Sequence, residues 1–249
     1  MRIVLIADIH GNRVALDAIL DDMAAERVDQ IICLGDVVAY GPQPTEVMAR
    51  LRDIGCPVVM GDTETSLLWP ETPAADETLR RLQDIERWAR ERLTPTERDV
   101  LASFPPTLAV ALAPNVSLLC YHGSPRSFKD RIMATTGADE LDRMLDGTVA
   151  QLYAGGHTHL QMVRRHRDAL LLNPGSVGLA YDRVPSPDLP ASAVRNPPWG
   201  EYAILSSVRS SLSLDLRRVP FDVRALLQSA RDNGMPHADW WCAEWDDAP

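Results

Sequence analysis

Acids and histidines that could bind metal stand directly after short apolar runs in this 249-residue chain. The groups are Asp8-Ile9-His10, Gly35-Asp36, His122-Gly123 and Gly155-Gly156-His157-Thr158-His159. Open α/β sheets place functional side chains at such strand ends. Four of the six histidines belong to this set, which core packing alone would not explain. The set predicts a hydrolytic centre with two metal ions.

The spacing within two of these groups suits a shared ion. Asp8 and His10 stand two residues apart, as do His157 and His159, and such residues in an extended segment point the same way. Asp36 follows the next strand and could bridge two cations. Taken alone, an aspartate after a strand more often stabilises a turn or caps a helix. A single histidine at such a position is more often a polar group with ordinary hydrogen-bond partners than a metal ligand. Taken together, the four positions favour a metal site.

Apolar runs predict the elements that must position this set. Buried strands are expected at 3–7, 31–34 and 57–60, with helices over 14–25 and 44–52 between them, an order that predicts a parallel sheet. Further helices are expected within 64–104 and over 139–145 and 221–233. Hairpins are expected over 107–121 and 202–219, and single strands at 151–154, 161–165 and 169–172. The strand-rich second half favours an α/β (α+β) sandwich of two mixed β-sheets flanked by helices over one wound sheet.

No internal repeat or long linker divides the chain. We therefore expect a single domain over 1–249, with a helical insertion at about 64–104 and a C-terminal helix and tail at about 220–249. The proline-rich stretch 185–198 predicts a surface loop. The tail tryptophans Trp240, Trp241 and Trp245 are expected to pack against the body or an interface.

Composition narrows the class of protein. The net charge of −10 argues against a broad nucleic-acid-binding surface. The four cysteines form no CxxC pair, which favours buried reduced thiols in a reducing compartment. No signal peptide and no apolar run long enough for a membrane span is visible, so we expect a cytoplasmic protein without a membrane partner. A homo-oligomer remains possible on these grounds.

The ordered motifs resemble those of the calcineurin-like metallophosphoesterase superfamily, which run D-x-H, G-D, G-N-H-[DE], H and G-H-x-H. The stretches DIHGN at 8–12, LGDVVAYGP at 34–42 and NPGSV at 173–177 resemble its bacterial and archaeal YfcE-type phosphodiesterase group. The resemblance spans residues 1 to about 179. It implies the metallophosphoesterase fold, with two sheets packed face to face. It also implies a dinuclear-metal-dependent phosphodiesterase, in which a metal-bridging hydroxide attacks phosphorus.

The resemblance also implies a ligand set. One ion would take Asp8, His10, Asp36 and His159, and the other Asp36, Asp62, His122 and His157. Asp36 would bridge the ions, and Asp36, Asp62 and His122 would be the catalytic residues. Histidine and aspartate ligands accept several divalent metals, of which manganese is our first expectation, with iron, zinc, nickel or cobalt as alternatives.

The third motif departs from the family pattern, because it is Gly61-Asp62-Thr63-Glu64. Asp62 replaces a neutral asparagine, which should favour cations and repel a phosphate dianion more than a diester monoanion. Thr63 replaces a histidine that assists the leaving group in many relatives. A general acid typically raises the reaction rate roughly 10²–10⁴-fold. Two alternatives therefore stay open: a catalytically weakened binding or scaffold protein, and a phosphomonoesterase or protein phosphatase.

Four residues near the motifs are candidates for contact with a small phosphate-ester substrate. They are Asn12, Tyr40, Thr63 and Arg126. Helix capping is the alternative for Asn12, packing on the Gly41-Pro42 turn for Tyr40, and a solvated basic loop for Arg126. The Asn173-Pro174-Gly175-Ser176 stretch predicts a tight turn, which the family match places close to the metals.

Overall fold

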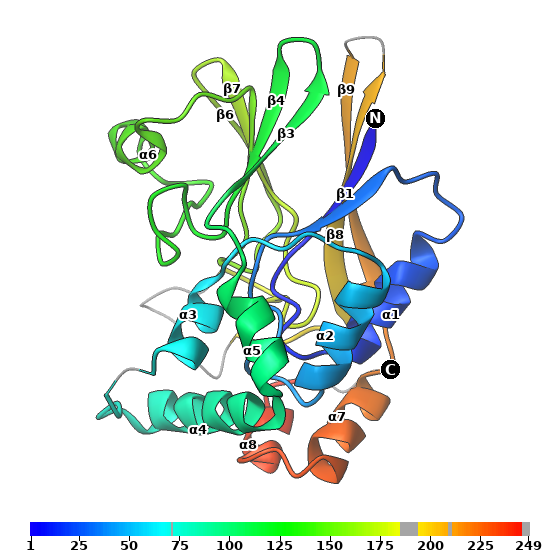
Figure 1. Cartoon of the computed structure of the whole chain (residues 1–249), viewed down its shortest axis with the longest axis vertical. Helices are drawn as coiled ribbons and strands as arrows, with labels where there is room; N and C mark the ends of the chain where they lie inside the picture. The colour runs from blue at the N-terminus through cyan, green and yellow to red at the C-terminus, as the bar shows by residue number, and fades with distance from the viewer. Residues whose placement is uncertain (71, 185–193, 209–210, 246–249) are drawn as a thin grey trace.

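The computed structural model describes residues 1–70, 72–184, 194–208 and 211–245, and contains two β-sheets packed face to face between helices (Figure 1). In chain order the elements are β1 (Arg2–Ile6), α1 (Arg13–Asp22), β2 (Gln30–Cys33), α2 (Pro44–Asp53), α3 (Asp62–Leu68), α4 (Glu77–Arg92), α5 (Pro95–Ala102), β3 (Leu108–Ala113), β4 (Val116–Cys120), α6 (Ala138–Leu145), β5 (Leu152–Ala154), β6 (Met162–His166), β7 (Ala169–Asn173), β8 (Trp199–Val208), β9 (Ser211–Pro220), α7 (Val223–Asp232) and α8 (Ala238–Cys242).

Both sheets are mixed, as the sequence predicts. The first has the order β2-β1-β8-β9, with β1 parallel to β2 and antiparallel to β8. The second has the order β3-β4-β5-β7-β6, in which β4, β5 and β7 run parallel. The segments that carry six of the seven predicted metal ligands follow β1, β2, β4 and β5, and the seventh, Asp62, begins α3. Parallel pairing within each sheet therefore brings these segments to the same edge.

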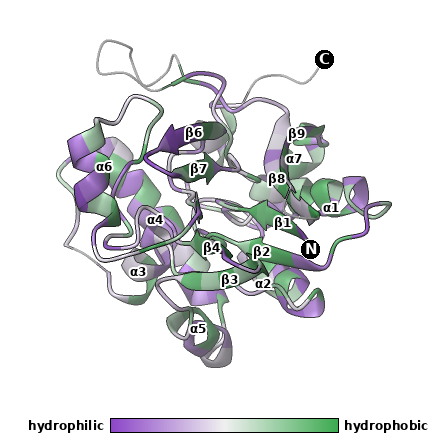
Figure 2. Cartoon of the chain, turned by 90° about the horizontal axis from the view of Figure 1, so that it is seen from above, coloured by the Kyte–Doolittle hydropathy of each residue, from purple (hydrophilic) through white to green (hydrophobic). Residues whose placement is uncertain are grey.

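The main core lies between the sheets and follows from the alternation of side chains along each strand. Ile3 and Leu5 of β1 pack in the inter-sheet cluster with Leu118 and Leu152 of the second sheet. Val4 and Ile6 point the other way and pack against α1 and α2. Figure 2 shows β1 and β2 mostly hydrophobic at the centre of the molecule. Both faces of β1 are covered, which explains its unbroken apolar sequence.

Helices cover the outer faces of the sandwich. Leu141 and Leu145 of α6 pack on the second sheet beside Tyr153. Helices α4, α7 and α8 share a separate cluster at the lower end of Figure 1, where Trp241 and Trp245 are buried. The tail tryptophans thus pack on the body of the protein, as expected.

Two details differ from the sequence-based expectation, and a third lies mostly outside the described residues. Residues 57–60 form no strand: Val58 makes an isolated parallel bridge to Cys33, and Pro57 has no N–H to donate. The short helix α8 was not expected, because five residues are too few for a periodic signal. Most of the proline-rich stretch, 185–193, lies outside the described residues. The other expected elements are present, with ends within a few residues of those predicted.

The thiol and membrane expectations can be compared directly with the structure. Cys33, Cys120 and Cys242 are buried free thiols, and Cys56 is a half-buried one. Across the described ranges, no helix combines the length and the apolar character needed to cross a bilayer.

Candidate metal centre

The structure brings all seven predicted metal ligands together at one edge of the sandwich. They form three overlapping groups whose donor atoms lie within 4.8 Å of one another. The groups are Asp8, His10 and His159; Asp62, His122 and His157; and Asp8, Asp36 and His122. Asp8, Asp36, His10 and His122 are almost completely buried, whereas Asp62 and His157 are more accessible. The predicted ligands therefore come together in one centre from four strand ends and the start of α3.

The hydrogen bonds of three histidines fix which ring nitrogen faces this centre. Nδ1 of His10, His122 and His159 lies 3.0, 2.7 and 2.6 Å from the carbonyl oxygens of Ala39, Leu34 and Leu179, respectively. A carbonyl only accepts, so each Nδ1 carries a proton and donates it. Each Nε2 then points inward. Metal-binding histidines in proteins are commonly oriented in this way.

Asp36 occupies the position between the two outer groups. Its Oδ2 lies 3.7 Å from Nε2 of His10, and its Oδ1 lies 3.4 Å from Nε2 of His122. The backbone N–H of Thr63 donates to Oδ1 at 3.0 Å and holds the carboxylate in place. The two oxygens of one side chain thus face the histidines of both groups.

Asp62 completes the second group. Its Oδ1 lies 2.9 Å from Nε2 of His122 and 3.0 Å from Nδ1 of His157. Burial on its own would raise the pKa of the Asp62 carboxyl, but hydrogen bonds from the two histidines hold this pKa well below its usual range. Asp62 is therefore a carboxylate at any ordinary pH, with a charge available for a cation.

Two of the histidines, His122 and His159, favour the protonated form where cations could sit. Burial, together with the neighbouring His159, lowers the pKa of His10 to about 4. Burial opposes charge on His122 and His159 as well, but Asp36 raises the pKa of His122 and Asp8 raises that of His159. Binding of a cation would have to displace these protons.

Most of the ligand residues adopt a backbone conformation that side chains rarely take. The φ angles are 54° at Asp8, 48° at His10, 57° at Asp36, 68° at His157 and 58° at His159. The extended geometry predicted for the two i, i+2 pairs is therefore wrong, although both pairs do converge. Left-handed conformations at non-glycine residues cost on the order of 1–3 kcal/mol each and cluster at functional sites.

Glu64 holds the backbone of the loop that carries Asp36, a role that the sequence did not predict. Its carboxylate accepts hydrogen bonds from the backbone N–H groups of Asp36 and Val37 at 2.8 Å and of Gly61 at 3.0 Å. The side chain is fully buried, and burial beside Asp36 raises its pKa, but both oxygens accept from backbone N–H groups, which favours the ionised form. The acid at the end of the third motif was the signal that could have identified it.

The 173–176 segment forms the expected tight turn and braces two ligand loops. The Asn173 side chain accepts from the N–H of Gly175 and donates to the carbonyl of Gly156 at 2.6 Å. The Ser176 hydroxyl donates to the carbonyl of Asp8 at 2.7 Å. The turn therefore ties the segment after β1 to the segment after β5.

Two of the predicted substrate contacts have structural partners. The Asn12 side chain accepts from the N–H of Ala15 as the N-cap of α1 and donates to the carbonyl of Gly178. The Tyr40 hydroxyl donates to Glu86 at 2.6 Å, and its ring stacks on His10 with centroids 5.6 Å apart. Both residues support the walls of the centre. Their contact with substrate stays a prediction.

The other two predicted contacts lie in different surroundings. Arg126 is half-exposed, and its guanidinium donates to Asp146 and to the carbonyl of Arg143, both at α6. Thr63 is 3% exposed, and its Oγ1 has no hydrogen-bond partner within the described residues. An unpaired buried hydroxyl one residue from Asp62 is unusual and requires an explanation.

Comparison with known proteins agrees with this geometry. A family model described as a calcineurin-like phosphoesterase superfamily domain matches residues 1–188. The uncharacterized protein MJ0912 of Methanocaldococcus jannaschii is 24% identical over 249 residues, covering 97% of this chain and 96% of that protein. A metallophosphoesterase structure from Sphaerobacter thermophilus superposes with a TM-score of 0.74 at 24% identity, covering 98% of this chain and 99% of that chain. The hypothetical protein PH1004 from Pyrococcus horikoshii OT3 superposes with a TM-score of 0.77 at 18% identity, covering 99% of both chains. The fold is that of the metallophosphoesterases.

Proposed function

The chain belongs to the calcineurin-like phosphoesterase superfamily, and from this premise we propose that it is a phosphodiesterase that works with two divalent metal ions. The observation that carries the proposal is the position of Asp36, whose two oxygens face His10 on one side and His122 on the other. A carboxylate in such a position can serve two cations at once.

The donors fit divalent cations. Asp8, His10 and His159 would hold one ion, and Asp62, His122 and His157 the other, with Asp36 shared. Nε2 of His10 and of His159 lie 3.0 Å apart with both Nδ1 atoms bound to carbonyls, an arrangement that needs a proton or a cation between the rings. The mixed imidazole and carboxylate set suits manganese first, and iron, zinc, nickel or cobalt otherwise.

Charge favours a diester over a monoester. Bound divalent ions supply Lewis-acid stabilisation of the charge that develops on phosphoryl oxygens. The carboxylates of Asp8, Asp36 and Asp62 would neutralise three of the four positive charges of two such ions. The hydroxide that hydrolysis requires would cancel the remaining charge, which leaves no excess positive charge to favour a monoester dianion over a diester monoanion.

Residues of the chain would orient the ester and assist its leaving group only weakly. The unpaired Thr63 hydroxyl is a hydrogen-bond donor beside Asp62, but it is not an acid of useful pKa near neutrality. We therefore expect turnover of diesters with good leaving groups, such as p-nitrophenolate, and slow turnover of alkyl diesters.

The first experiment compares bis-p-nitrophenyl phosphate with p-nitrophenyl phosphate, using protein loaded with Mn²⁺. The proposal requires turnover of the diester and its loss in Asp36→Asn, which keeps the shape of the side chain and removes its charge. Asp142→Asn is the matched control, since Asp142 lies on α6 outside the centre and pairs there with Arg167 of the β6–β7 turn. Unaltered diester turnover in Asp36→Asn would overturn the proposal.

Asp62→Asn tests the charge argument separately. Removal of one negative charge should raise monoester turnover relative to diester turnover, because the dianion gains more from it. A monoester preference already present in the original protein would favour the phosphomonoesterase alternative. Bound metal without turnover of either ester would favour the binding or scaffold alternative.

A further inference from the structure

A cavity of about 550 Å³ opens beside the metal centre, between α3 and α4. Asp62 and Tyr40 line its inner end, and Ser66 of α3 lines its wall. Because Asp62 belongs to both the cavity and the second ligand group, a phosphate at the centre would have one ester arm directed into this space. Its volume suits an organic group considerably larger than p-nitrophenol.

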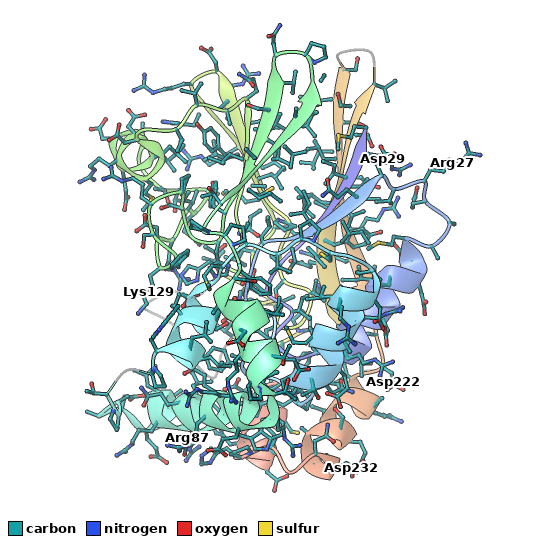
Figure 3. All side chains as sticks on the ribbon, in the orientation of Figure 1. Arg27, Asp29, Arg87, Lys129, Asp222 and Asp232 are labelled. Carbon is teal, nitrogen blue, oxygen red and sulfur yellow. The ribbon has the colours of Figure 1, made fainter. Side chains whose placement is uncertain are left out.

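One face of α4 gives the cavity a row of cations. Arg80, Arg87 and Arg90 all line it and are exposed, at spacings of seven and three residues that place them on the same side of the helix. Lys129 contributes from the loop after β4. Figure 3 labels Arg87 on α4 and Lys129 above α3. The row stands out because the whole chain carries a net charge of −10.

Two of these arginines lack a counterion. Arg87 pairs with Asp84, but the guanidinium groups of Arg80 and Arg90 make no ion pair or hydrogen bond with any described residue. The other acids of the described lining are also engaged: Asp62 contacts His122 and His157, and Glu86 accepts hydrogen bonds from Tyr40 and Ser66, each at 2.6 Å. The acids of the cavity are thus occupied, while two of its cations remain available for an anion.

The cavity also has an apolar component. Leu67, Pro70, Pro73, Leu79 and Leu82 line it together with the arginines. Leu79 is 53% exposed. An exposed leucine and neighbouring prolines beside cations suit a ligand that joins an apolar or aromatic body to an anionic group.

We propose that this cavity binds the second arm of a phosphate diester whose phosphorus lies at the metal centre, and that this arm carries a further anionic group recognised by Arg80 or Arg90. The inference rests on the proposed function. The expected substrates resemble nucleotides: a flat or apolar group lies between two phosphates. Arg90 lies one helical turn from Glu86, at the metal end of the face, and Arg80 lies toward the start of α4.

Two esters that differ only in the second anion test the proposal. They are thymidine 5′-(p-nitrophenyl phosphate) and the same ester with a 3′-phosphate. The original protein should show a kcat/KM about two- to fivefold higher for the 3′-phosphorylated ester, as one well-formed contact to an exposed arginine would give. In the double variant Arg80→Ala/Arg90→Ala this ratio should fall to about one. The single variants identify which end of α4 holds the anion.

Arg52→Ala is the control, since Arg52 is an exposed arginine of α2 paired with Asp53 and does not line the cavity. It removes one positive charge and should leave the ratio of the two esters unchanged. An equal ratio in the original protein and the double variant would overturn the proposal. A ratio lowered as much by Arg52→Ala would also overturn it, because the preference would then reflect overall charge.

Failure of the underlying function gives a different result. If none of the esters is turned over, binding of thymidine 3′,5′-bisphosphate to the metal-loaded protein is measured by calorimetry. Binding weakened about two- to fivefold in the double variant supports the cavity assignment without any catalysis. Equal binding in the original protein and the double variant overturns it.

Discussion

Nε2 of His10 lies 3.0 Å from Nε2 of His159, and the Nδ1 atoms of both rings donate to backbone carbonyls. Two imidazole lone pairs cannot face each other at this distance without a cation between them. In the metal-free protein a proton on His159, whose pKa Asp8 raises against the effect of burial, serves that purpose. The lowered pKa of His10, about 4, makes this ring the acceptor.

A divalent cation should replace this proton and stabilise the fold. At a concentration 100 times its dissociation constant, a ligand that binds only the folded state adds about 2.7 kcal/mol to the free energy of unfolding. Thermal unfolding with added Mn²⁺ should show this gain in the original protein and lose most of it in His10→Ala and His159→Ala. His237→Ala is the control, because His237 pairs with Asp84 away from the centre. A gain retained in His159→Ala would contradict the assignment.

Gly61 should tolerate no side chain, because it packs against the central ligand. A Cβ there would lie 2.1 Å from Oδ1 of Asp36 and 2.6 Å from its backbone nitrogen. Gly61→Ala should therefore displace Asp36, abolish the Mn²⁺-dependent gain in stability and cost about 1–3 kcal/mol from overpacking.

Gly137→Ala is a matched control for this change. Gly137 is also a helix N-cap with negative φ, but a Cβ there meets nothing within 4 Å. It should leave Mn²⁺ binding intact and change the free energy of unfolding by less than about 0.5 kcal/mol. Similar effects of the two substitutions on Mn²⁺ binding would show that Gly61 does not set the position of Asp36.

Glu64 should affect metal binding without touching the metal. Glu64→Gln replaces one acceptor oxygen by an NH₂ group, which must face backbone N–H groups that now donate to the carboxylate. We expect a loss of about 1–3 kcal/mol in the free energy of unfolding and a roughly 10–100-fold weaker affinity for Mn²⁺. Calorimetric titration with Mn²⁺ and denaturant unfolding measure the two effects.

Glu97→Gln provides the comparison, since Glu97 accepts from the N-cap Thr94 in an exposed capping box where glutamine serves equally well. It should change neither quantity appreciably. A Glu64→Gln variant with the Mn²⁺ affinity of the original protein would show that the loop after β2 holds its shape without this carboxylate.

The sequence predicted residue types and element order better than local backbone geometry. Six of the seven predicted ligands could be identified because each is a metal-type side chain at or just after the end of an apolar run, and such runs form strands whose parallel ends meet. Asp62 was identified only through the resemblance of its motif to that of the family, since the run before it forms no strand. The left-handed φ at Asp8 and His10 could not be anticipated, because composition favours it only weakly at non-glycine residues.

The supporting residues were harder to predict, because their roles depend on contacts between distant segments. Glu64 bonds a loop 27–28 residues away, and Glu86 bonds Tyr40 across 46 residues. Residues 57–60 have the apolar character of a strand, but only Val58 makes a bridge to β2. Local pattern indicates which segments are buried, and tertiary packing decides how they pair.

Glu86 should make stability depend on pH. Burial raises the pKa of this carboxyl above its ordinary value. The folded state therefore holds the proton more tightly than the unfolded chain, so the contribution to stability is fully present below pH 4.5 and is lost as pH rises through the folded pKa. Near neutral pH the buried charge is a net cost.

Glu86→Gln removes this charge and keeps an oxygen that can accept from both Tyr40 and Ser66. With chelator present, its free energy of unfolding should exceed that of the original protein at pH 7, and the difference should shrink toward pH 4. Denaturant unfolding at the two pH values measures the difference. A difference that is the same at both values would show that Glu86 does not titrate differently in the folded state.

Thr63 should show opposite effects on stability and activity. Its Oγ1 is buried without a hydrogen-bond partner within the described residues. A buried hydroxyl without a partner lowers the free energy of unfolding by about 1–3 kcal/mol. Thr63→Val keeps the shape and removes the hydroxyl, so the variant should be more stable by about 1 kcal/mol in denaturant unfolding. Thr65→Val on the same helix should have the opposite sign, because the Thr65 hydroxyl donates to the carbonyl of Asp62 at 2.7 Å.

If the Thr63 hydroxyl assists the departing oxygen, Thr63→Val should lower kcat/KM, and the loss should grow as the leaving group becomes more basic. A series of aryl diesters from p-nitrophenyl to phenyl measures this dependence. Equal losses across the series would assign the hydroxyl to binding of the phosphate instead. A Thr63→Val protein that is less stable and equally active would show that the hydroxyl serves the fold, and that an ordered water satisfies it.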